Sequence, residues 1–236
     1  MVSNVFGFIL PIREIAALCR EKRVPLIVDA SQAAGILDVD FTALGAAFIA
    51  MPGHKGLLGP QGTGLLLCGE RGEPLLSGGS GSDSLLQAMP EYLPDRLEAG
   101  THNVCGIAGL LAGVRYVQAH GCAGIRRREQ QLMRRFTEQL SGTAHLRMFL
   151  SRDPELQTAV LSLIPEAIGP DAFAEALNAN GLAVRTGLHC APTAHRTAGT
   201  ISTGTVRFSF SPFNTEQQID YAAEICKKIL KNAVFF

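Results

Sequence analysis

The stretch MPGHKGLLGPQGTG, residues 51–64, places a histidine and a lysine inside a glycine-rich turn directly after an apolar run. An earlier stretch, LIVDASQAAG at residues 26–35, ends another apolar run on Asp29. Both runs are typical of short buried strands. Because open α/β sheets bind ligands at the carboxyl ends of their strands, we expect Asp29 and Lys55 to face one crevice. The glycines around His54 and Lys55 would let the backbone approach a ligand closely.

Each of these residues has a simpler interpretation when it is taken alone. Asp29 could be a turn or helix-capping aspartate, and Lys55 could be an exposed loop lysine. In a crevice that excludes water, however, a lysine supplies the free amine that carbonyl chemistry requires. The order and spacing of the residues, rather than any single one, decide between the two interpretations.

This order and spacing resemble the class V aminotransferase family of fold-type I pyridoxal-phosphate enzymes, which contains the cysteine desulfurases and selenocysteine lyases. The resemblance implies that Lys55 forms the Schiff base with pyridoxal 5'-phosphate and that Asp29 pairs with the ring nitrogen. It also implies that Gln32 contacts the ring hydroxyl and that His54 contacts the phosphate. Asn4, in the segment SNVFG, matches a family asparagine near the ring hydroxyl.

Three further segments match the family. LEAGTHN resembles a segment whose threonine reaches the cofactor phosphate of a partner subunit, so Thr101 would act across a homodimer. AVRTGLHCAP resembles the desulfurase loop that carries the nucleophilic cysteine, here Cys190. In GTVRFSFSPFNT, Arg207 would hold the substrate carboxylate, with Arg185 as a second candidate. Alone, Cys190 could be a buried structural cysteine and Arg207 a charge at a sheet edge.

Composition limits the class of protein. The chain has 236 residues, with 21 Lys and Arg against 21 Asp and Glu, so its charge does not favour a nucleic acid or an acidic membrane as partner. No stretch approaches the ~18 apolar residues of a membrane helix. The six cysteines include no CxxC pair, which disfavours a disulfide framework or a metal site. We expect a cytoplasmic protein.

The periodicity predicts an α/β arrangement followed by a small α+β unit. Helices are expected at 11–23, 103–121, 124–140, 170–181 and from 215, with strands at 25–31, 46–52, 63–70, 157–165, 182–187 and 205–213. Residues 71–98 are expected to form a long loop. We predict that residues 1–120 form the C-terminal portion of a large cofactor-binding domain. Residues 121–236 would form a connecting helix and the small domain.

The chain departs from the family pattern in two places. It starts just before the SNV segment, so the family's phosphate-binding loop, ring-stacking histidine and first strands are not part of it. We therefore expect a fold-type I large-domain sheet that is N-terminally incomplete, with an exposed edge. Pro52 replaces a hydroxyl residue of the family and has no backbone N–H, which should weaken phosphate binding.

The expected function is that of a pyridoxal-phosphate-dependent cysteine desulfurase. Sulfur would move from L-cysteine, or selenium from selenocysteine, to Cys190, with release of alanine. A protein that accepts the sulfur is compatible with this chemistry. Two alternatives stay open: an aminotransferase or lyase of the same family, and an inactive fragment that serves only as an interaction or dimerisation module.

Overall fold

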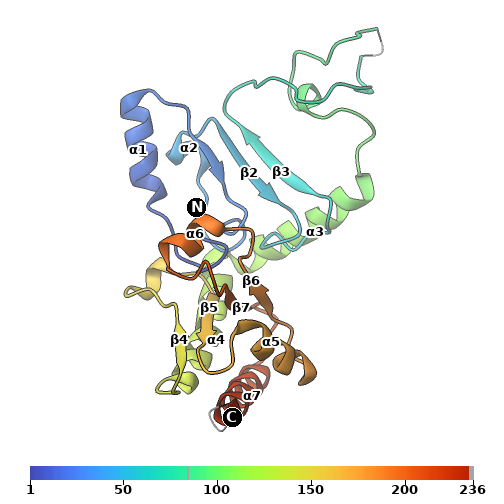
Figure 1. Ribbon diagram of the computed structural model, residues 1–236. Helices are drawn as coiled ribbons and strands as arrows, with labels where there is room; N and C mark the ends of the chain where they lie inside the picture. The colour runs from blue at the N-terminus through green and yellow to red at the C-terminus, as the bar shows by residue number, and fades with distance from the viewer. Residues whose placement is uncertain (84, 234–236) are drawn as a thin grey trace. The chain divides into compact units, whose positions relative to one another are not determined.

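The computed structural model describes residues 1–83 and 85–233 and contains two compact units. One unit contains Met1 and Pro11–Gly121, and the other contains Val2–Leu10 together with the chain from Cys122 onward. Figure 1 labels most of the helices and strands of both units. Among the helices of the described residues, none combines the length and the apolar character that crossing a bilayer requires.

The first unit is built on a three-stranded sheet in the order β1-β2-β3. β1 (Ile27–Asp29) and β2 (Phe48–Pro52) are parallel, whereas β3 (Gly64–Cys68) returns antiparallel to β2. Helix α1 (Ile12–Lys22) precedes β1, and the short helix α2 (Phe41–Leu44) precedes β2. The three predicted strands are therefore confirmed. In the parallel register, Asp29 of β1 lies beside Ala50 of β2, so the carboxyl ends of both strands lie at the same edge of the sheet.

Helix α3 (Val104–His120) follows the long segment after β3, in which the only regular element among the described residues is a short 3-10 helix at Asp95–Leu97. Ser84, within this expected loop, lies outside the described residues. The sequence of residues 103–121 is nearly all apolar and predicts a buried helix, and this prediction is wrong for part of the helix surface. Only one face is buried, and apolar side chains such as Val104 and Ile107 are exposed. Continuous hydrophobicity shows that a helix has apolar faces but not that this chain covers each of them.

The second unit contains a four-stranded sheet in the order β4-β5-β7-β6, whose pairings are all antiparallel. The strands are β4 (Leu146–Met148), β5 (Val160–Pro165), β6 (Arg185–Gly187) and β7 (Thr205–Ser209). The helices are α4 (Cys122–Leu140), α5 (Pro170–Ala179), the short α6 (Pro192–Thr197) and α7 (Glu216–Ala233).

The core of this unit lies between the sheet and helices α4, α5 and α7. Phe136 of α4, Phe173 of α5 and Leu161 of β5 are all fully buried there. The helical spacing of the sequence predicts an apolar stripe on α4 and an inward face on α7. Both are confirmed, by Ile125, Leu132, Phe136 and Leu140 on α4 and by Ile219, Ala222, Ala223, Cys226 and the partly buried Ile229 on α7. The sequence Thr215-Glu216-Gln217-Gln218 has the pattern of a capping box at the start of α7, and this prediction is confirmed: Thr215 Oγ1 accepts from the Gln218 amide at 3.2 Å, and Gln218 Oε1 accepts from the Thr215 amide at 3.1 Å.

Candidate functional site

Asp29 is the last residue of β1, and its carboxylate is held by the backbone that follows. Its Oδ1 accepts a hydrogen bond from the Ser31 amide at 2.7 Å, and the Met1 ammonium donates to its carbonyl oxygen at 2.9 Å. Burial alone would raise the pKa of Asp29. The bonds from Ser31, together with the charges of the N-terminus and Lys55, outweigh burial and lower it. Asp29 is therefore a carboxylate at neutral pH, as pairing with a cationic ring nitrogen requires.

Lys55 lies in the turn that follows β2, at the same edge of the sheet. The turn is closed by three backbone bonds: Gly53 N to Thr63 O at 2.8 Å, Gly59 N to Gly53 O at 2.7 Å and Leu58 N to Lys55 O at 2.9 Å. Lys55 is half-buried, and it lies close enough to Asp29 for its positive charge to lower the pKa of that carboxyl group. The structure thus brings an amine and a carboxylate to one edge of the sheet.

The glycines of this turn are needed for close packing within the chain. A Cβ on Gly35, whose φ is +82°, would lie 2.0 Å from the carbonyl oxygen of Gly56. Helix α3 also approaches closely, since a Cβ on Gly113 would lie 2.2 Å from Leu57 O. The glycine-rich pattern therefore seats the Lys55 turn between the loop after β1 and helix α3. This packing function was not among the expectations from the sequence.

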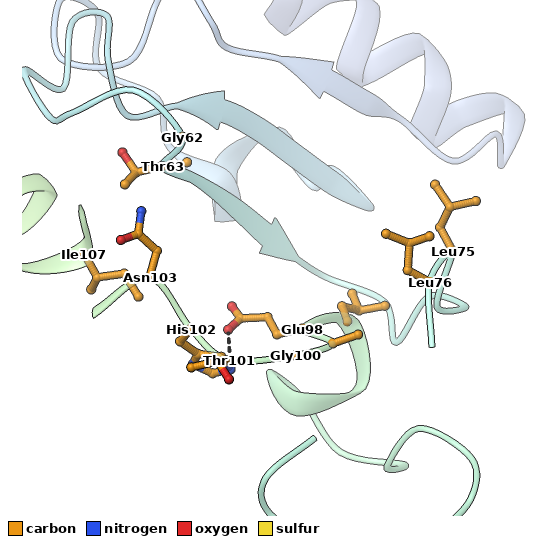
Figure 2. A pocket seen from close by; sticks show the side chains of 13 residues that line it. Gly62, Thr63, Leu75, Leu76, Glu98, Gly100, Thr101, His102, Asn103 and Ile107 are labelled. Carbon is orange, nitrogen blue, oxygen red and sulfur yellow. Dashed lines mark ion pairs between the residues drawn. The ribbon is translucent and has the colours of Figure 1, made fainter. Parts of the chain in front are cut away.

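The other residues proposed for the cofactor in this unit are more exposed. Gln32 is half-buried in the turn after Asp29, and His54 is exposed beside Lys55. Thr101 is exposed and lines an open pocket of about 410 Å³ together with Thr63, Asn103 and Ile107. Figure 2 shows this pocket, with Glu98 and His102 paired at its rim at 3.3 Å.

Cys190 belongs to the second unit, at the end of a turn that leaves β6. Cys190 is exposed, and His189 and Cys190 both have positive φ angles, +50° and +58° respectively. Asn4 also belongs to this unit: its Nδ2 donates to His189 O at 2.7 Å, and its carbonyl oxygen accepts from Arg207 Nη1 at 2.8 Å. Asn4 therefore joins the cysteine turn to Arg207.

Arg207 and Arg185 are register partners on the neighbouring strands β7 and β6. Arg207 is half-buried and Arg185 is exposed. Burial, and then the neighbouring charge of Arg185, lowers the pKa of Arg207. The Nε of Arg207 is buried and has no hydrogen-bond partner among the described residues. Two guanidinium groups on one face, one with an unpaired buried donor, are suited to binding a carboxylate.

Sequence reasoning missed His189, which is buried beside the candidate nucleophile and contacts Thr205. The available signal was a histidine next to Cys190 in the segment LHCAP. A histidine in that position can be exposed or buried, and only the fold distinguishes the two.

The family model for aminotransferase class V matches residues 1–222. This chain belongs to the class V aminotransferase family. A probable cysteine desulfurase from Pyrococcus abyssi is 32% identical over 238 residues, which cover 98% of this chain and 58% of that protein. One from Methanothermobacter thermautotrophicus is 35% identical over 238 residues, covering 97% and 58%.

Solved structures agree with this membership. The apo structure of cysteine desulfurase from Thermococcus onnurineus NA1 matches with a TM-score of 0.88 at 32% identity, over 98% of this chain and 58% of that one. The cysteine desulfurase CsdA from Escherichia coli matches with a TM-score of 0.85 at 26% identity, over the same shares. The predicted fold class is therefore confirmed, and the chain spans 58% of the length of these relatives.

Proposed function

We propose that this chain carries the reacting groups of a pyridoxal-phosphate-dependent cysteine desulfurase, which moves sulfur from L-cysteine to the Cys190 thiol and releases alanine. The observation that carries the proposal is the exposed Cys190, on a turn that leaves a strand bearing Arg185 and is joined through Asn4 to Arg207. A thiol beside a carboxylate-binding pair suits an amino-acid substrate that gives up its sulfur.

The residues of the first unit fit the cofactor that the family uses. Lys55 offers a primary amine, and Asp29 offers an ionised carboxylate at the same sheet edge. Gln32 and His54 would contribute polar contacts from the adjacent turns, and Thr101 would contribute one from the pocket of Figure 2. Bound pyridoxal phosphate supplies an electron sink for the bonds of the substrate's Cα and Cβ.

The roles of the chain's own groups follow from their chemistry. Arg207 binds the substrate carboxylate, and the Lys55 amine takes the proton from Cα. The Cys190 thiolate attacks the substrate sulfur, so an S–S bond forms while the Cβ–S bond breaks. Protonation of Cβ and return of a proton from Lys55 to Cα complete alanine, and a persulfide stays on Cys190. The atoms balance without an external oxidant, since cysteine and thiol become alanine and persulfide.

The decisive experiment measures alanine released from cysteine in the presence of pyridoxal phosphate. We expect Cys190→Ser to abolish alanine release, while the control Cys105→Ser, at another exposed cysteine, keeps the parental rate. Borohydride reduction should leave the mass of the reduced cofactor on Lys55 and none in Lys55→Ala. A Cys190→Ser variant with the parental rate would exclude the persulfide step, and pyruvate in place of alanine would indicate a lyase.

We also propose that the protein acts as a homodimer in the cytoplasm. In the segment between β3 and α3, Leu75 and Leu85 are almost wholly exposed and Leu76 is three-quarters exposed. Leu75 and Leu76 line the pocket that includes Thr101. Exposed apolar clusters of this kind are typical of association surfaces. Light scattering should give twice the monomer mass, and Leu75→Asp with Leu76→Asp should reduce it toward the monomer. A monomer in the parental protein would contradict this proposal.

A further inference from the structure

The turn that carries Cys190 has an unfavourable backbone conformation. His189 and Cys190 are consecutive residues with φ of +50° and +58°, and neither is a glycine. Residues with a Cβ rarely adopt this left-handed region, and they persist there when surrounding contacts hold them. Within the turn, residues 188–191, one backbone hydrogen bond forms, from the Ala191 amide to Leu188 O at 2.8 Å. Contacts with other segments must therefore hold the turn.

The imidazole of His189 supplies the first of these contacts. It is buried, and its Nε2 lies 3.2 Å from both the carbonyl oxygen and Oγ1 of Thr205. Thr205 Oγ1 donates to Ser162 Oγ at 3.2 Å, and Ser162 Oγ donates to Val5 O at 2.6 Å. Because each hydroxyl proton points onward to the next oxygen, both Thr205 oxygens can only accept from His189. Nε2 therefore carries the proton and is the donor.

The backbone of His189 supplies the second contact. Its carbonyl oxygen accepts from Asn4 Nδ2, and the carbonyl oxygen of Asn4 accepts from Arg207 Nη1. Burial, followed by the positive charge of Arg207, lowers the pKa of His189 to about 4. The imidazole is therefore neutral near pH 7 and adds no charge beside the arginine. It anchors the turn and is not suited to act as a base.

We propose that His189 is a positioning residue for Cys190, because its imidazole bond to Thr205 and its carbonyl bond from Asn4 hold the turn that presents the thiol. This inference rests on the proposed function in which Cys190 receives the sulfur. Loss of the anchor should impair sulfur transfer more than substrate binding, since Arg207 on β7 binds the carboxylate from outside the turn.

The test compares two substitutions at one position. His189→Leu removes the donor, whereas the amide nitrogen of His189→Gln can reach the place of Nε2. His195→Leu is the control, because it removes a buried imidazole whose ring centre lies 5.9 Å from that of His189 but which bonds Thr200 Oγ1 at 2.7 Å and not Thr205; it therefore separates loss of the bond to Thr205 from loss of a neighbouring ring. Hydrogen exchange of the amides of residues 188–191 reports on the turn without cofactor or substrate. The kcat and KM for cysteine report on the reaction.

We expect His189→Leu to speed exchange of the Ala191 amide about tenfold and to lower kcat about tenfold, with KM within about threefold of the parental value. His189→Gln should recover most of both losses, and His195→Leu should resemble the parental protein. If His189→Leu does not fold, Thr205→Val should loosen the turn in the same direction by a smaller factor, since the Thr205 carbonyl oxygen stays in place.

Parental exchange in His189→Leu, or in Thr205→Val where that variant replaces it, would overturn the inference. So would equal loosening in His195→Leu, a His189→Gln variant no better than His189→Leu, or an unchanged kcat with a loosened turn. If the parental chain releases no alanine, the proposed function fails, while the exchange comparison still decides whether His189 anchors the turn.

Discussion

Arg185 and Arg207 lie directly opposite each other on the antiparallel strands β6 and β7, so their side chains leave the same face of the sheet. Like charges in such a pair repel, and burial followed by this repulsion lowers the pKa of Arg207. An anion between the two guanidinium groups would offset the repulsion. The arrangement therefore favours ligands with a carboxylate.

Arg207→Lys should raise the KM for cysteine about tenfold or more, because lysine lacks the planar fork that binds both carboxylate oxygens. A lysine still offers one donor to the carbonyl oxygen of Asn4, so the turn should remain in place. Steady-state kinetics measures the effect. Arg152→Lys, at an exposed arginine of the same unit, is the control, and an equal rise in KM there would contradict the assignment.

Glu129 of α4 should make stability depend on pH. Burial raises the pKa of this carboxyl to about 8, against 4.5 in the unfolded chain. Between these values the folded state holds a proton that the unfolded state has lost, so the free energy of unfolding falls as pH rises, by up to about 5 kcal/mol over this range. Glu129→Gln should flatten this slope in denaturant unfolding, and Glu138→Gln, at an exposed site on the same helix, should keep it.

Gly35→Ala should destabilise the first unit by about 2 kcal/mol or more, because the new methyl group would overlap the Gly56 carbonyl oxygen. It should also weaken cofactor trapping on Lys55, which adjoins Gly56. Gly62→Ala is the matched control, since Gly62 has a similar φ of +76° and open space around its Cβ position. Equal losses of stability in the two variants would mean that backbone strain, and not the contact, sets the effect.

Thr215→Ala should cost about 1 kcal/mol of stability, because it removes the hydroxyl that caps α7 at the Gln218 amide. Thermal unfolding followed by circular dichroism would measure this loss. Thr137→Ala, within α4, removes a hydroxyl that bonds only a carbonyl oxygen of the preceding turn and should cost much less. A larger loss at Thr137 would argue against the capping contribution.

The parts of the site that follow strand ends were predictable from the sequence. The apolar runs before Asp29 and Lys55 have the length of buried strands, and parallel pairing then places both residues at one edge. The capping box of α7 could also be predicted, because Thr215 and Gln218 are only three positions apart in the chain. Local pattern determines such features, so a single sequence contains them.

Features that depend on distant contacts were not predictable. β4 has only three residues, with an arginine at its centre, and α6 is short and polar, so neither shows a period. The bond between His189 and Thr205 joins residues 16 positions apart, and it forms because β6 and β7 pair. The exposed face of α3 depends on what else packs there, which hydrophobicity cannot reveal.

The left-handed backbone conformation at Cys190 lowers the stability of the protein at a position where the proposed reaction needs a thiol. Glycine adopts a φ near +58° without the penalty of about 1 kcal/mol that a Cβ incurs. Cys190→Gly should therefore raise the free energy of unfolding while it removes the thiol. A mutant library screened for heat resistance alone would therefore drift toward glycine at position 190, whereas a screen for sulfur release would restore the cysteine.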